Sequence, residues 1–516
     1  MDAVQLSIFA SRVSALCDEM GAVLRRAAFS PNIKDRLDFS CALFDARGQL
    51  CAQAAHIPVH LGSMAYAMAD LVGAHDWRPG DMLVLNDPYQ GGTHLPDVTL
   101  IAPVFVNSQC LGFVANRAHH ADIGADSPGS MPIGRCLEDE GLLITPTWLL
   151  KDRVIQPAVL DRIVAATHNP LITEGDFSAQ ISANRTGVQR VQELVGDLGA
   201  GRYLQGLSAI NAYGERMART TFQRLPDGDY RFEDVMDDDG QGKRDIRLQV
   251  CISIRDHCIR VDFSGTEPQV AGNINCPLSV AAAAVFYVFR CLMDQRTPAC
   301  AGSFRSIAID APAGCLVNAL PPAAVAAGNV ETSSRIVDLV SGALAAAIPD
   351  QMAAASQGTM NNLAMGARGD QANWDYYETL GGGMGAGRYG GGLHAVQTHM
   401  TNTLNTAIET LEAAYPVRIN RYAIRRGSGG AGLRAGGDGL IREYQFLASA
   451  QATLLTERRR HPPWGLFGGE SGQLGENRLN GVCLPAKVAL SLEAGDCLEI
   501  RTPGGGGFST PGIDNM

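Results

Sequence analysis

Apolar residues near the start of the chain recur at the spacing of one helix face. Residues three or four positions apart lie on the same side of an α-helix, so the pattern predicts an amphipathic helix that ends before Pro31. A second helix is expected after the sequence HIPVH and should end near Gly73. The apolar face of the first helix consists of Val4, Ile8, Val13, Leu16, Met20, Val23 and Leu24.

Short apolar runs bounded by turn residues predict strands around the second helix. Residues 107–109 separate two of these runs, so we expect the two to pair as an antiparallel hairpin. A loop rich in glycine, proline and acidic residues follows the hairpin as far as Pro132. The predicted strands are Cys41–Phe44, Met82–Leu85, Val98–Val106 and Cys110–Ala115.

The second half of the chain combines three further patterns. Residues 172–217 predict helices interrupted at glycines, and residues 247–266 alternate like two strands around Asp256. Continuous apolar stretches at Leu278–Met293 and Ser334–Ile348 predict buried helices.

Beyond Gln351 the chain becomes dense in glycine, which predicts short strands and tight turns. We therefore expect a mixed α/β (α+β) fold with more than one domain. The expected domains are an N-terminal α/β domain at residues 1–222, a middle α/β domain at 223–350, and a glycine-rich, β-rich C-terminal domain at 351–516.

Charge and composition exclude two kinds of partner. The formal net charge is −11, and no basic run provides the face that nucleic acid requires. No apolar stretch has the length of a membrane span; the nearest, Val280–Phe289, stops at Arg290. The 13 cysteines form no CxxC pair and no secretory leader precedes the first helix, so we expect reduced thiols and a cytoplasmic protein.

The glycine-rich loops lack the residues that bind nucleotides. A Walker A loop needs Gly-Lys followed by Ser or Thr, but Gly242-Lys243 is followed by Arg244. The sequence GGGMGAGRYGGG has no strand and helix around it in the order that a dinucleotide site requires. No GxSxG motif occurs, and no cysteine stands out as a nucleophile. We predict that this chain does not itself hold ATP.

Histidines concentrate around the predicted hairpin. His94 and Asp97 stand at the entry to its first strand, and His119 and His120 stand just beyond its second strand. Antiparallel pairing brings these positions to one end of the sheet. Six of the 11 histidines fall in a window of 65 residues: His56, His60, His75, His94, His119 and His120.

Two interpretations of this cluster stay open at this point. Two imidazoles and a carboxylate suit Mn²⁺, Zn²⁺ or Fe²⁺ and leave coordination positions free for water. A polar rim of the sheet explains the same residues without a metal. Asp38 is either a further ligand or base, or a surface carboxylate paired with Arg36. Asp87 and Asp122 flank the cluster and could cap a turn or orient a ligand histidine.

Several blocks of the sequence resemble, in order, the signature blocks of the hydantoinase B family. Together they cover nearly the whole chain, and their combination is specific although no single block is. The blocks are SPNIKDRLDFSCALFD, HIPVHLGSM, NDPYQGGTHLPDVTLIAPVF, HHADIGADSPGSMP, AGNVETSSRIVDLV, RINRYAIRRGSGGAG and TPGGGGF.

The family comprises B subunits or domains of ATP-dependent hydantoinases, 5-oxoprolinases and caprolactamases, and the larger subunits of acetone- and acetophenone-type carboxylases are its relatives. The resemblance implies a hydantoinase A-type partner that binds ATP and Mg²⁺ and phosphorylates the oxygen of a small cyclic amide. It also implies an A₂B₂ heterotetramer. In the reaction that the resemblance implies, this phosphorylation comes first, and water then opens the lactam or hydantoin ring at a metal centre in the B subunit.

Carried onto this sequence, the family's metal ligands fall on His94, Asp97 and His119, with Asp38 as a fourth ligand or catalytic base. His120 and Asp122 are further candidates for catalytic residues. The resemblance is compatible with Mn²⁺ or Zn²⁺, and also with Fe²⁺. Two alternative functions are a subunit of an ATP-dependent ketone carboxylase and a non-catalytic scaffold of the complex. At 516 residues the chain lacks the extensions of the larger carboxylase subunits, and this favours the hydrolase.

Overall fold

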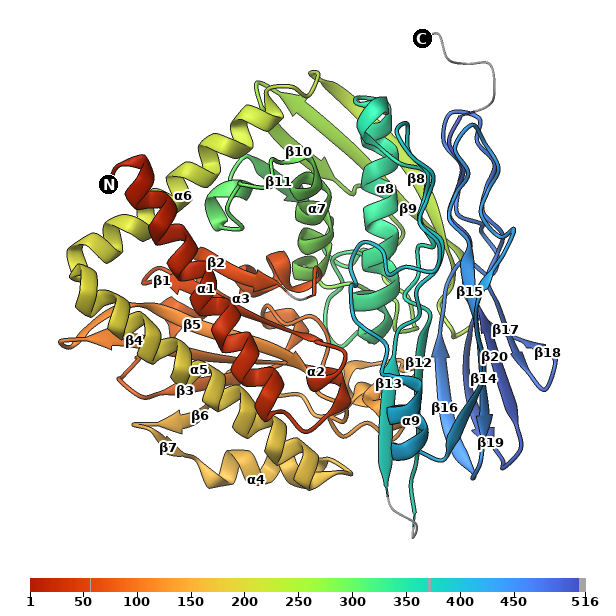
Figure 1. Cartoon of the computed structure of the whole chain (residues 1–516), viewed down its shortest axis with the longest axis horizontal. Coiled ribbons are helices and arrows are strands. Elements are labelled where there is room, and N and C mark those ends of the chain that lie inside the picture. The colour runs from red at the N-terminus through yellow and green to blue at the C-terminus, as the bar shows by residue number, and fades with distance from the viewer. Residues whose placement is uncertain (56, 370–372, 510–516) are drawn as a thin grey trace.

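The computed structural model describes residues 1–55, 57–369 and 373–509. An antiparallel sheet of seven strands forms the N-terminal part of the chain (Figure 1). His56, one of the six clustered histidines, lies outside the described residues. The strands are β1 (Phe39–Asp45), β2 (Leu50–Ala55), β3 (Met82–Leu85), β4 (Asp97–Val106), β5 (Gln109–His119), β6 (Thr147–Lys151) and β7 (Val154–Ile155). Their order across the sheet is β2–β1–β5–β4–β3–β6–β7.

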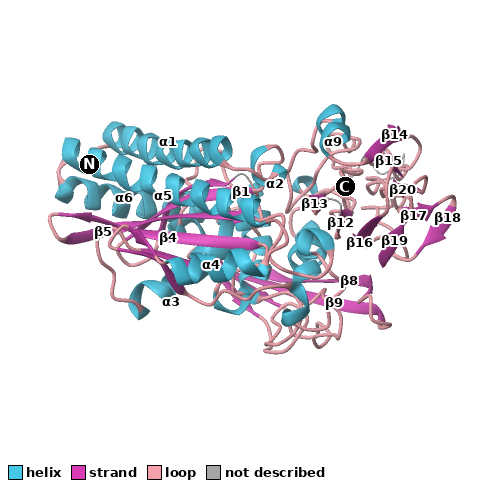
Figure 2. Ribbon diagram, turned by 90° about the horizontal axis from the view of Figure 1, so that it is seen from below, coloured by secondary structure: helices cyan, strands magenta, loops and turns pink. Residues whose placement is uncertain are grey.

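Helices cover both faces of this sheet (Figure 2). Alternate residues of β4 point to opposite faces, so that Val98 and Leu100 join one apolar cluster and Ile101 joins another. Met20 packs in the first cluster and Met68 in the second. The helices on the first face are α1 (Ala3–Ala27), α5 (Pro170–Leu198) and α6 (Ala200–Phe222); α3 (His60–Ala74) covers the second face, and α2 (Pro31–Lys34) and α4 (Pro157–Ala166) are shorter.

The middle of the chain forms a second sheet, of four strands. Asp256 and His257 connect two of its strands with positive φ angles of 48° and 69°, which is the geometry of a two-residue hairpin turn. The strands are β8 (Gly228–Asp238), β9 (Arg244–Arg255), β10 (Cys258–Asp262) and β11 (Ile307–Asp310), in the order β11–β10–β9–β8. Helix α8 (Ser333–Ala345) packs against β8 and β9, and α7 (Leu278–Leu292) packs against α8. A π-helical turn, Gly328–Thr332, leads into α8.

Two further sheets form the C-terminal part, together with the short helix α9 (Ile408–Ala414). The strands are β12 (Asn362–Ala367), β13 (Trp374–Glu378), β14 (Val417–Arg425), β15 (Gly439–Phe446), β16 (Ala450–Leu455), β17 (Glu476–Leu479), β18 (Val482–Leu484), β19 (Lys487–Leu492) and β20 (Cys497–Arg501). One sheet has the order β13–β12–β16–β19 and the other β14–β15–β20–β17–β18.

Close packing of backbones accounts for the glycine-dense sequence of this region. A Cβ atom at Gly504 would lie 1.8 Å from the carbonyl oxygen of Ser428, and one at Gly505 would lie 2.1 Å from that of Met384. A side chain of any size would prevent these approaches, so glycine is required here for space.

The structure has the predicted mixed α/β class, and most predicted elements are present. The hairpin differs at one end, because β5 runs to His119 rather than stopping at Ala115. Asn116 and Arg117 are polar, so their sequence resembles a loop. In the structure both are buried and hydrogen-bonded inside the fold. The segment that contains β6, β7 and α4 was not predicted to be ordered into elements.

The largest apolar cluster combines residues from all three predicted domains, for example Val59, Ile252 and Leu455. The boundaries after residues 222 and 350 stay predictions. None of the helices in the described part of the chain has the length and apolarity needed to cross a membrane. The cytoplasmic location also stays a prediction.

Candidate metal centre

The β4–β5 hairpin places Asp97 and His119 opposite each other. Asp97 is the first residue of β4, His119 is the last of β5, and the two are register partners. The preceding loop folds back onto these strand ends. The Asp97 N–H donates to the carbonyl oxygen of His94 at 3.1 Å, and the His120 N–H donates to that of Pro96 at 2.9 Å. His94 is therefore held beside the strand ends.

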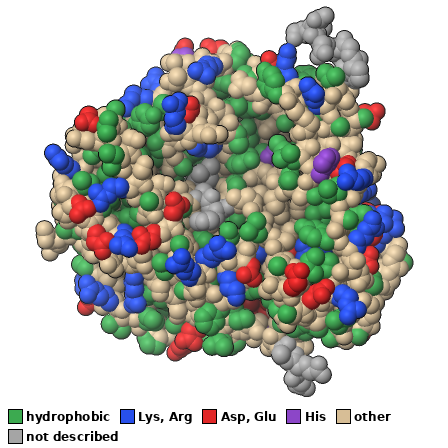
Figure 3. Space-filling view, in the orientation of Figure 1, with side chains coloured by type: hydrophobic (Ala, Val, Ile, Leu, Met, Phe, Trp, Pro, Cys, Tyr) green, Lys and Arg blue, Asp and Glu red, His purple; other side chains and the backbone are tan. Residues whose placement is uncertain are grey.

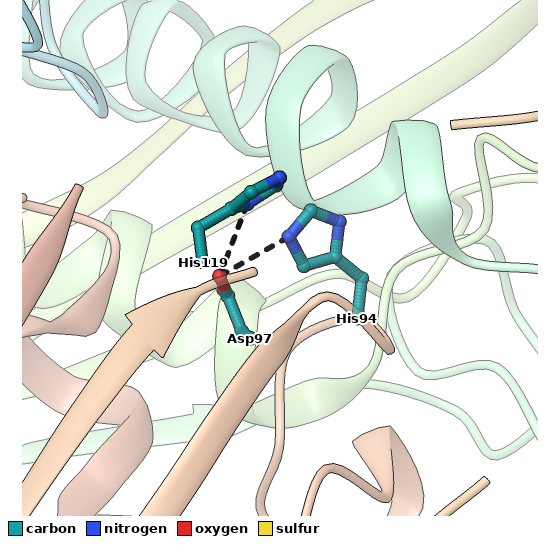
Figure 4. Close-up of side chains that lie close together, drawn as sticks. All are labelled: His94, Asp97 and His119. Carbon is teal, nitrogen blue, oxygen red and sulfur yellow. Dashed lines mark ion pairs between the residues drawn. The ribbon is translucent and has the colours of Figure 1, made fainter. Parts of the chain in front are cut away.

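The side chains of His94, Asp97 and His119 converge on one point (Figure 4). Nε2 of His94 and Nδ1 of His119 each lie 3.3 Å from Oδ1 of Asp97. One ligand atom from each residue lies within 4.8 Å of the others. Their exposed fractions are 0%, 1% and 2%, so the cluster is shielded from bulk water.

A second group of ligand atoms shares Asp97 with this cluster. Atoms of Asp38, His60 and Asp97 also lie within 4.8 Å of one another. Nε2 of His60 is 3.4 Å from Oδ2 of Asp97, and Nδ1 of His60 is 3.0 Å from the hydroxyl of Ser40. The Asp38 carboxylate, 7% exposed, lies 3.9 Å from Nη2 of Arg36. Asp38 thus lies beside the cluster and is paired with Arg36 at the same time.

Several atoms of the cluster are buried without a hydrogen-bond partner. They are both ring nitrogens of His94, Oδ1 of Asp97 and Nε2 of His119. Buried polar atoms without a partner are rare in folded proteins, and imidazole nitrogen with carboxylate oxygen is a ligand set for Mn²⁺, Fe²⁺ or Zn²⁺. These residues therefore fit a divalent transition-metal ion.

The charges in the cluster are strongly coupled. Burial lowers the pKa of His94, but the Asp97 carboxylate outweighs this effect, so the pKa is raised. Burial raises the pKa of Asp97, whereas the charge of His94 and the close approach of the His119 ring bring it well below its ordinary value. The pKa of His119 is lowered, chiefly by burial. Protons and a metal ion would compete for the same atoms.

A narrow cavity adjoins the cluster. Its volume is about 20 Å³, enough for one water molecule or one ion. Asp38, Asp97 and His119 contribute to its wall from the N-terminal part of the chain. Asn329 and Tyr377 contribute from the middle and C-terminal parts. The cavity therefore lies where all three parts of the chain meet.

Tyr377 fixes the plane of one imidazole. Its ring stacks on that of His119 with the ring centres 4.9 Å apart and an interplanar angle of 9°. The guanidinium of Arg36 lies 4.8 Å from the centre of the Tyr377 ring and donates to the Tyr377 carbonyl oxygen at 2.7 Å. A strand of the C-terminal part, β13, thus supports a candidate ligand of the N-terminal part.

The structure does not bring His120 and Asp122 into the cluster. Nε2 of His120 lies 2.9 Å from Oε1 of Gln180, and the Asp122 carboxylate lies 3.4 Å from Nδ1 of His168. Both residues line a second cavity of about 10 Å³ together with Asp176. The catalytic role of His120 and Asp122 stays a prediction.

Asp87 and His75 have structural partners outside the cluster. Asp87 caps a turn by accepting the N–H of Tyr89 at 2.9 Å, which is one of the two roles considered for it. The ring of His75 packs against those of Trp77 and Trp148, which also contact each other.

Sequence reasoning missed three contributors to the site. Thr93 donates to Oδ2 of Asp97 at 2.5 Å, and its position next to His94 was a usable signal. His60 belonged to the histidine window but was not assigned to the ligand set. Tyr377 has no local signal, because it reaches His119 only through the packing of distant segments.

Comparisons with known proteins identify relatives of the whole chain. The sequence profile described as Hydantoinase B/oxoprolinase matches residues 2–511. An uncharacterised protein of Methanocaldococcus jannaschii is 39% identical over 99% of this chain and 91% of its own length. The 5-oxoprolinase 1 of Arabidopsis thaliana is also 39% identical over 99% of this chain, which spans 42% of that longer protein.

Two solved structures share the fold. The ATP-dependent caprolactamase from Pseudomonas jessenii superposes with a TM-score of 0.93 at 25% identity, over 99% of this chain and 92% of that one. An acetone carboxylase superposes with a TM-score of 0.89 at 17% identity, over 98% of this chain and 76% of that one. The second similarity shows the fold alone.

Proposed function

Because the chain belongs to the hydantoinase B/oxoprolinase family, we propose that it is the metal-bearing subunit of an ATP-dependent cyclic amidase. Relatives named 5-oxoprolinase and the similarity to an ATP-dependent caprolactamase support a cyclic amide as substrate. The reaction is the hydrolysis of a lactam or hydantoin ring whose carbonyl oxygen a partner subunit has phosphorylated.

The proposal rests on one observation, the buried cluster of His94, Asp97 and His119. Its ligand atoms converge, several have no partner, and a cavity for one small molecule adjoins them. A structural rim of the sheet would place such side chains against partners or solvent instead.

His94, Asp97 and His119 would hold the ion, with Asp38 as a fourth ligand or as the base. Mn²⁺ and Zn²⁺ are both compatible with these ligands, and Fe²⁺ is a further candidate. When bound, the ion supplies a water molecule of lowered pKa and stabilises negative charge on oxygen. The carboxylate of Asp38 lies at the cavity and is placed to accept a proton there.

The overall reaction consumes two water molecules. One cleaves the ring C–N bond: its hydroxyl ends on the carbonyl carbon and its proton on the ring nitrogen. The other completes the hydrolysis of ATP to ADP and phosphate. An unstrained amide resists attack by water, and phosphorylation of its oxygen makes the carbon electrophilic.

We propose that a hydantoinase A-type subunit supplies this phosphorylation with ATP and Mg²⁺. The chain's own glycine-rich loops lack the sequence of a Walker A loop. An A₂B₂ assembly of the two subunits is the expected form.

The test combines the purified chain with a hydantoinase A-type partner, ATP, Mg²⁺ and Mn²⁺. Ring opening and ADP formation are measured with 5-oxoproline, hydantoin and caprolactam. We expect at least one ring to open, and the Asp97→Asn variant to lose ring opening. The Asp87→Asn variant is a matched control, because Asp87 lies in the loop that leads to β4 but caps a turn outside the cluster.

Two outcomes would contradict the proposal. Incorporation of labelled bicarbonate into the product would indicate a carboxylase. Undiminished ring opening by the Asp97→Asn variant would indicate that this chain is a scaffold.

A further inference from the structure

The cavity beside the cluster is lined by one unpartnered polar atom that does not belong to the candidate ligands. Among the described side chains that line it, three buried polar atoms have no hydrogen-bond partner: Oδ1 of Asp97, Nε2 of His119 and Oδ1 of Asn329. The first two belong to the candidate metal ligands. Asn329 comes from the sequence block AGNVETSSRIVDLV, to which the proposed function assigns no role.

Asn329 belongs to the π-helical turn Gly328–Thr332, which precedes α8. Turns of this kind are rare and often mark functional sites. The turn is held tightly: a Cβ atom at Gly328 would lie 1.8 Å from the carbonyl oxygen of Asn275. The hydroxyl of Thr332 donates to the Ile274 carbonyl oxygen at 2.5 Å, and the hydroxyl of Ser333 donates to the Asn329 carbonyl oxygen at 2.5 Å.

A chain of contacts links this turn to the cluster. Glu331 accepts hydrogen bonds from the Met360 N–H at 2.9 Å and from Nδ2 of Asn362 at 2.6 Å. The hydroxyl of Tyr377 donates to Oδ1 of Asn362 at 2.7 Å, and the Tyr377 ring stacks on His119. The distance across the cavity is therefore set by packed and hydrogen-bonded groups.

The side-chain oxygen of Asn329 needs a donor. The nearby hydroxyls of Thr379 and Thr403 lie 2.7 Å apart and are paired with each other. Thr401 lies 3.3 Å from Thr403 in the same group. The cavity has a volume of about 20 Å³, which is enough for one water molecule. A buried water molecule needs two to four polar partners. Water is the donor whose size and chemistry match.

We propose that Asn329 is a positioning residue for the water molecule that attacks the substrate. Its Oδ1 accepts one hydrogen bond from that water and so directs the water's lone pair toward the reacting carbon. Asp38 and Asp97 line the same cavity. This inference rests on the proposed function, because it names the group that orients the water in the same site.

The test compares Asn329→Ala, Asn329→Asp and the control Asn273→Ala. Asn273 is also buried with a side-chain oxygen that has no partner, but it does not line the cavity. Metal content, kcat and KM are measured in the complex with the partner subunit. A crystal structure of the metal-loaded chain is determined for the wild type and for Asn329→Ala.

We expect Asn329→Ala to keep its metal and its KM while kcat falls on the order of tenfold to hundredfold, the cost of a misplaced reactant. Asn329→Asp retains an acceptor oxygen and should recover part of this loss. Asn273→Ala should leave kcat unchanged. The wild-type crystal should show a water molecule within hydrogen-bond distance of Oδ1 of Asn329, and the Ala variant should lack it.

The inference is overturned if kcat is unchanged in Asn329→Ala, or if that variant loses its metal, since Asn329 would then be a ligand. Absence of any ring opening by the wild type would instead refute the proposed function. The crystal structures would still decide whether Asn329 holds a water, and no water there would overturn the inference on its own.

Discussion

Glu140 shows what burial does to a single carboxyl group. It has no exposed surface. Its Oε1 accepts the N–H groups of Val325 and Ala326, both at 2.8 Å, whereas its Oε2 has no partner. Burial is the main cause that raises its pKa from 4.5 to about 8. At neutral pH the group is therefore protonated in the folded chain and ionised in the unfolded chain.

We predict that the wild type loses stability relative to Glu140→Gln as the pH rises. Between 4.5 and about 8 the folded state holds a proton that the unfolded state releases, so stability is full below this window and falls as pH increases through it. The slope is at most about 1.4 kcal/mol per pH unit. The Gln variant keeps the Oε1 acceptor and cannot ionise.

Chemical denaturation of both proteins at about pH 5 and about pH 8 measures their free energies of unfolding. Between these two pH values the free energy of unfolding of the wild type should fall, relative to that of the Gln variant, by on the order of 2–4 kcal/mol. A constant difference across this range would contradict the assignment of a protonated Glu140.

At the residue scale, the sequence predicted those members of the cluster that one hairpin brings together. His94, Asp97 and His119 meet because a hairpin joins two neighbouring strands, and this follows from alternation and turn residues. Tyr377 and Asn329 reach the same cavity from segments with no such link. Their contribution depends on how separate sheets pack, which no periodic pattern encodes.

At the scale of elements, glycines set how closely α1 approaches the two long helices. A Cβ atom at Gly187 of α5 would lie 2.4 Å from Sδ of Met20 in α1, and one at Gly206 of α6 would lie 2.4 Å from the Phe9 ring. Gly196 of α5 differs, since apart from its chain neighbours and the backbone of its own helix no atom lies within 4 Å of its Cβ position. The same residue type thus serves packing at one position and only weakens the helix at another.

We predict opposite effects for two substitutions in α5. Gly196→Ala should stabilise the protein by about 0.5–1 kcal/mol, because alanine loses less backbone entropy in a helix. Gly187→Ala should destabilise it, because Met20 is buried and must move. Urea denaturation of both variants and the wild type measures this. Changes of the same sign would contradict the described packing of α1 on α5.

Elements with a clear period were predicted well, and those without one were not. The first helix, the strand Met82–Leu85 and the turn at Asp256 agree closely with the structure. The end of β5 was misjudged because Asn116 and Arg117 are polar residues inside the fold. Hydrogen bonds from Arg117 to Thr99 and Ser63 satisfy its guanidinium, and a single sequence does not show such partners.

For the whole molecule, a buried ionic network joins the middle and C-terminal parts. Nη2 of Arg458 lies 2.9 Å from carboxylate oxygens of both Asp234 and Asp338. Nη2 of Arg335 lies 3.1 Å from Oε2 of Glu457. In the sequence, Glu457-Arg458-Arg459-Arg460-His461 is a short basic run that contains its own counter-charge. Glu457 and Arg458 are nevertheless buried, whereas Arg460 is exposed, and this difference follows from the assembled fold.

The outer surface mixes basic, acidic and apolar side chains on the face shown in Figure 3. No large basic field is visible on this face, in keeping with the net charge of −11. The polar groups that carry the proposed chemistry lie inside, where the three parts of the chain meet around one cavity.

Elemental analysis of the purified chain tests the central claim most directly. The wild type is measured beside His94→Ala, His119→Ala and His120→Ala, under conditions that do not strip bound metal. His120 is the matched control, since it is buried next to His119 but its ring lies against Gln180 and Phe177.

We predict roughly one Mn²⁺, Zn²⁺ or Fe²⁺ ion per chain in the wild type and in His120→Ala, and none in the other two variants. A wild type without a transition metal, or a His94→Ala variant that keeps one, would contradict the assignment of His94, Asp97 and His119 as a metal centre.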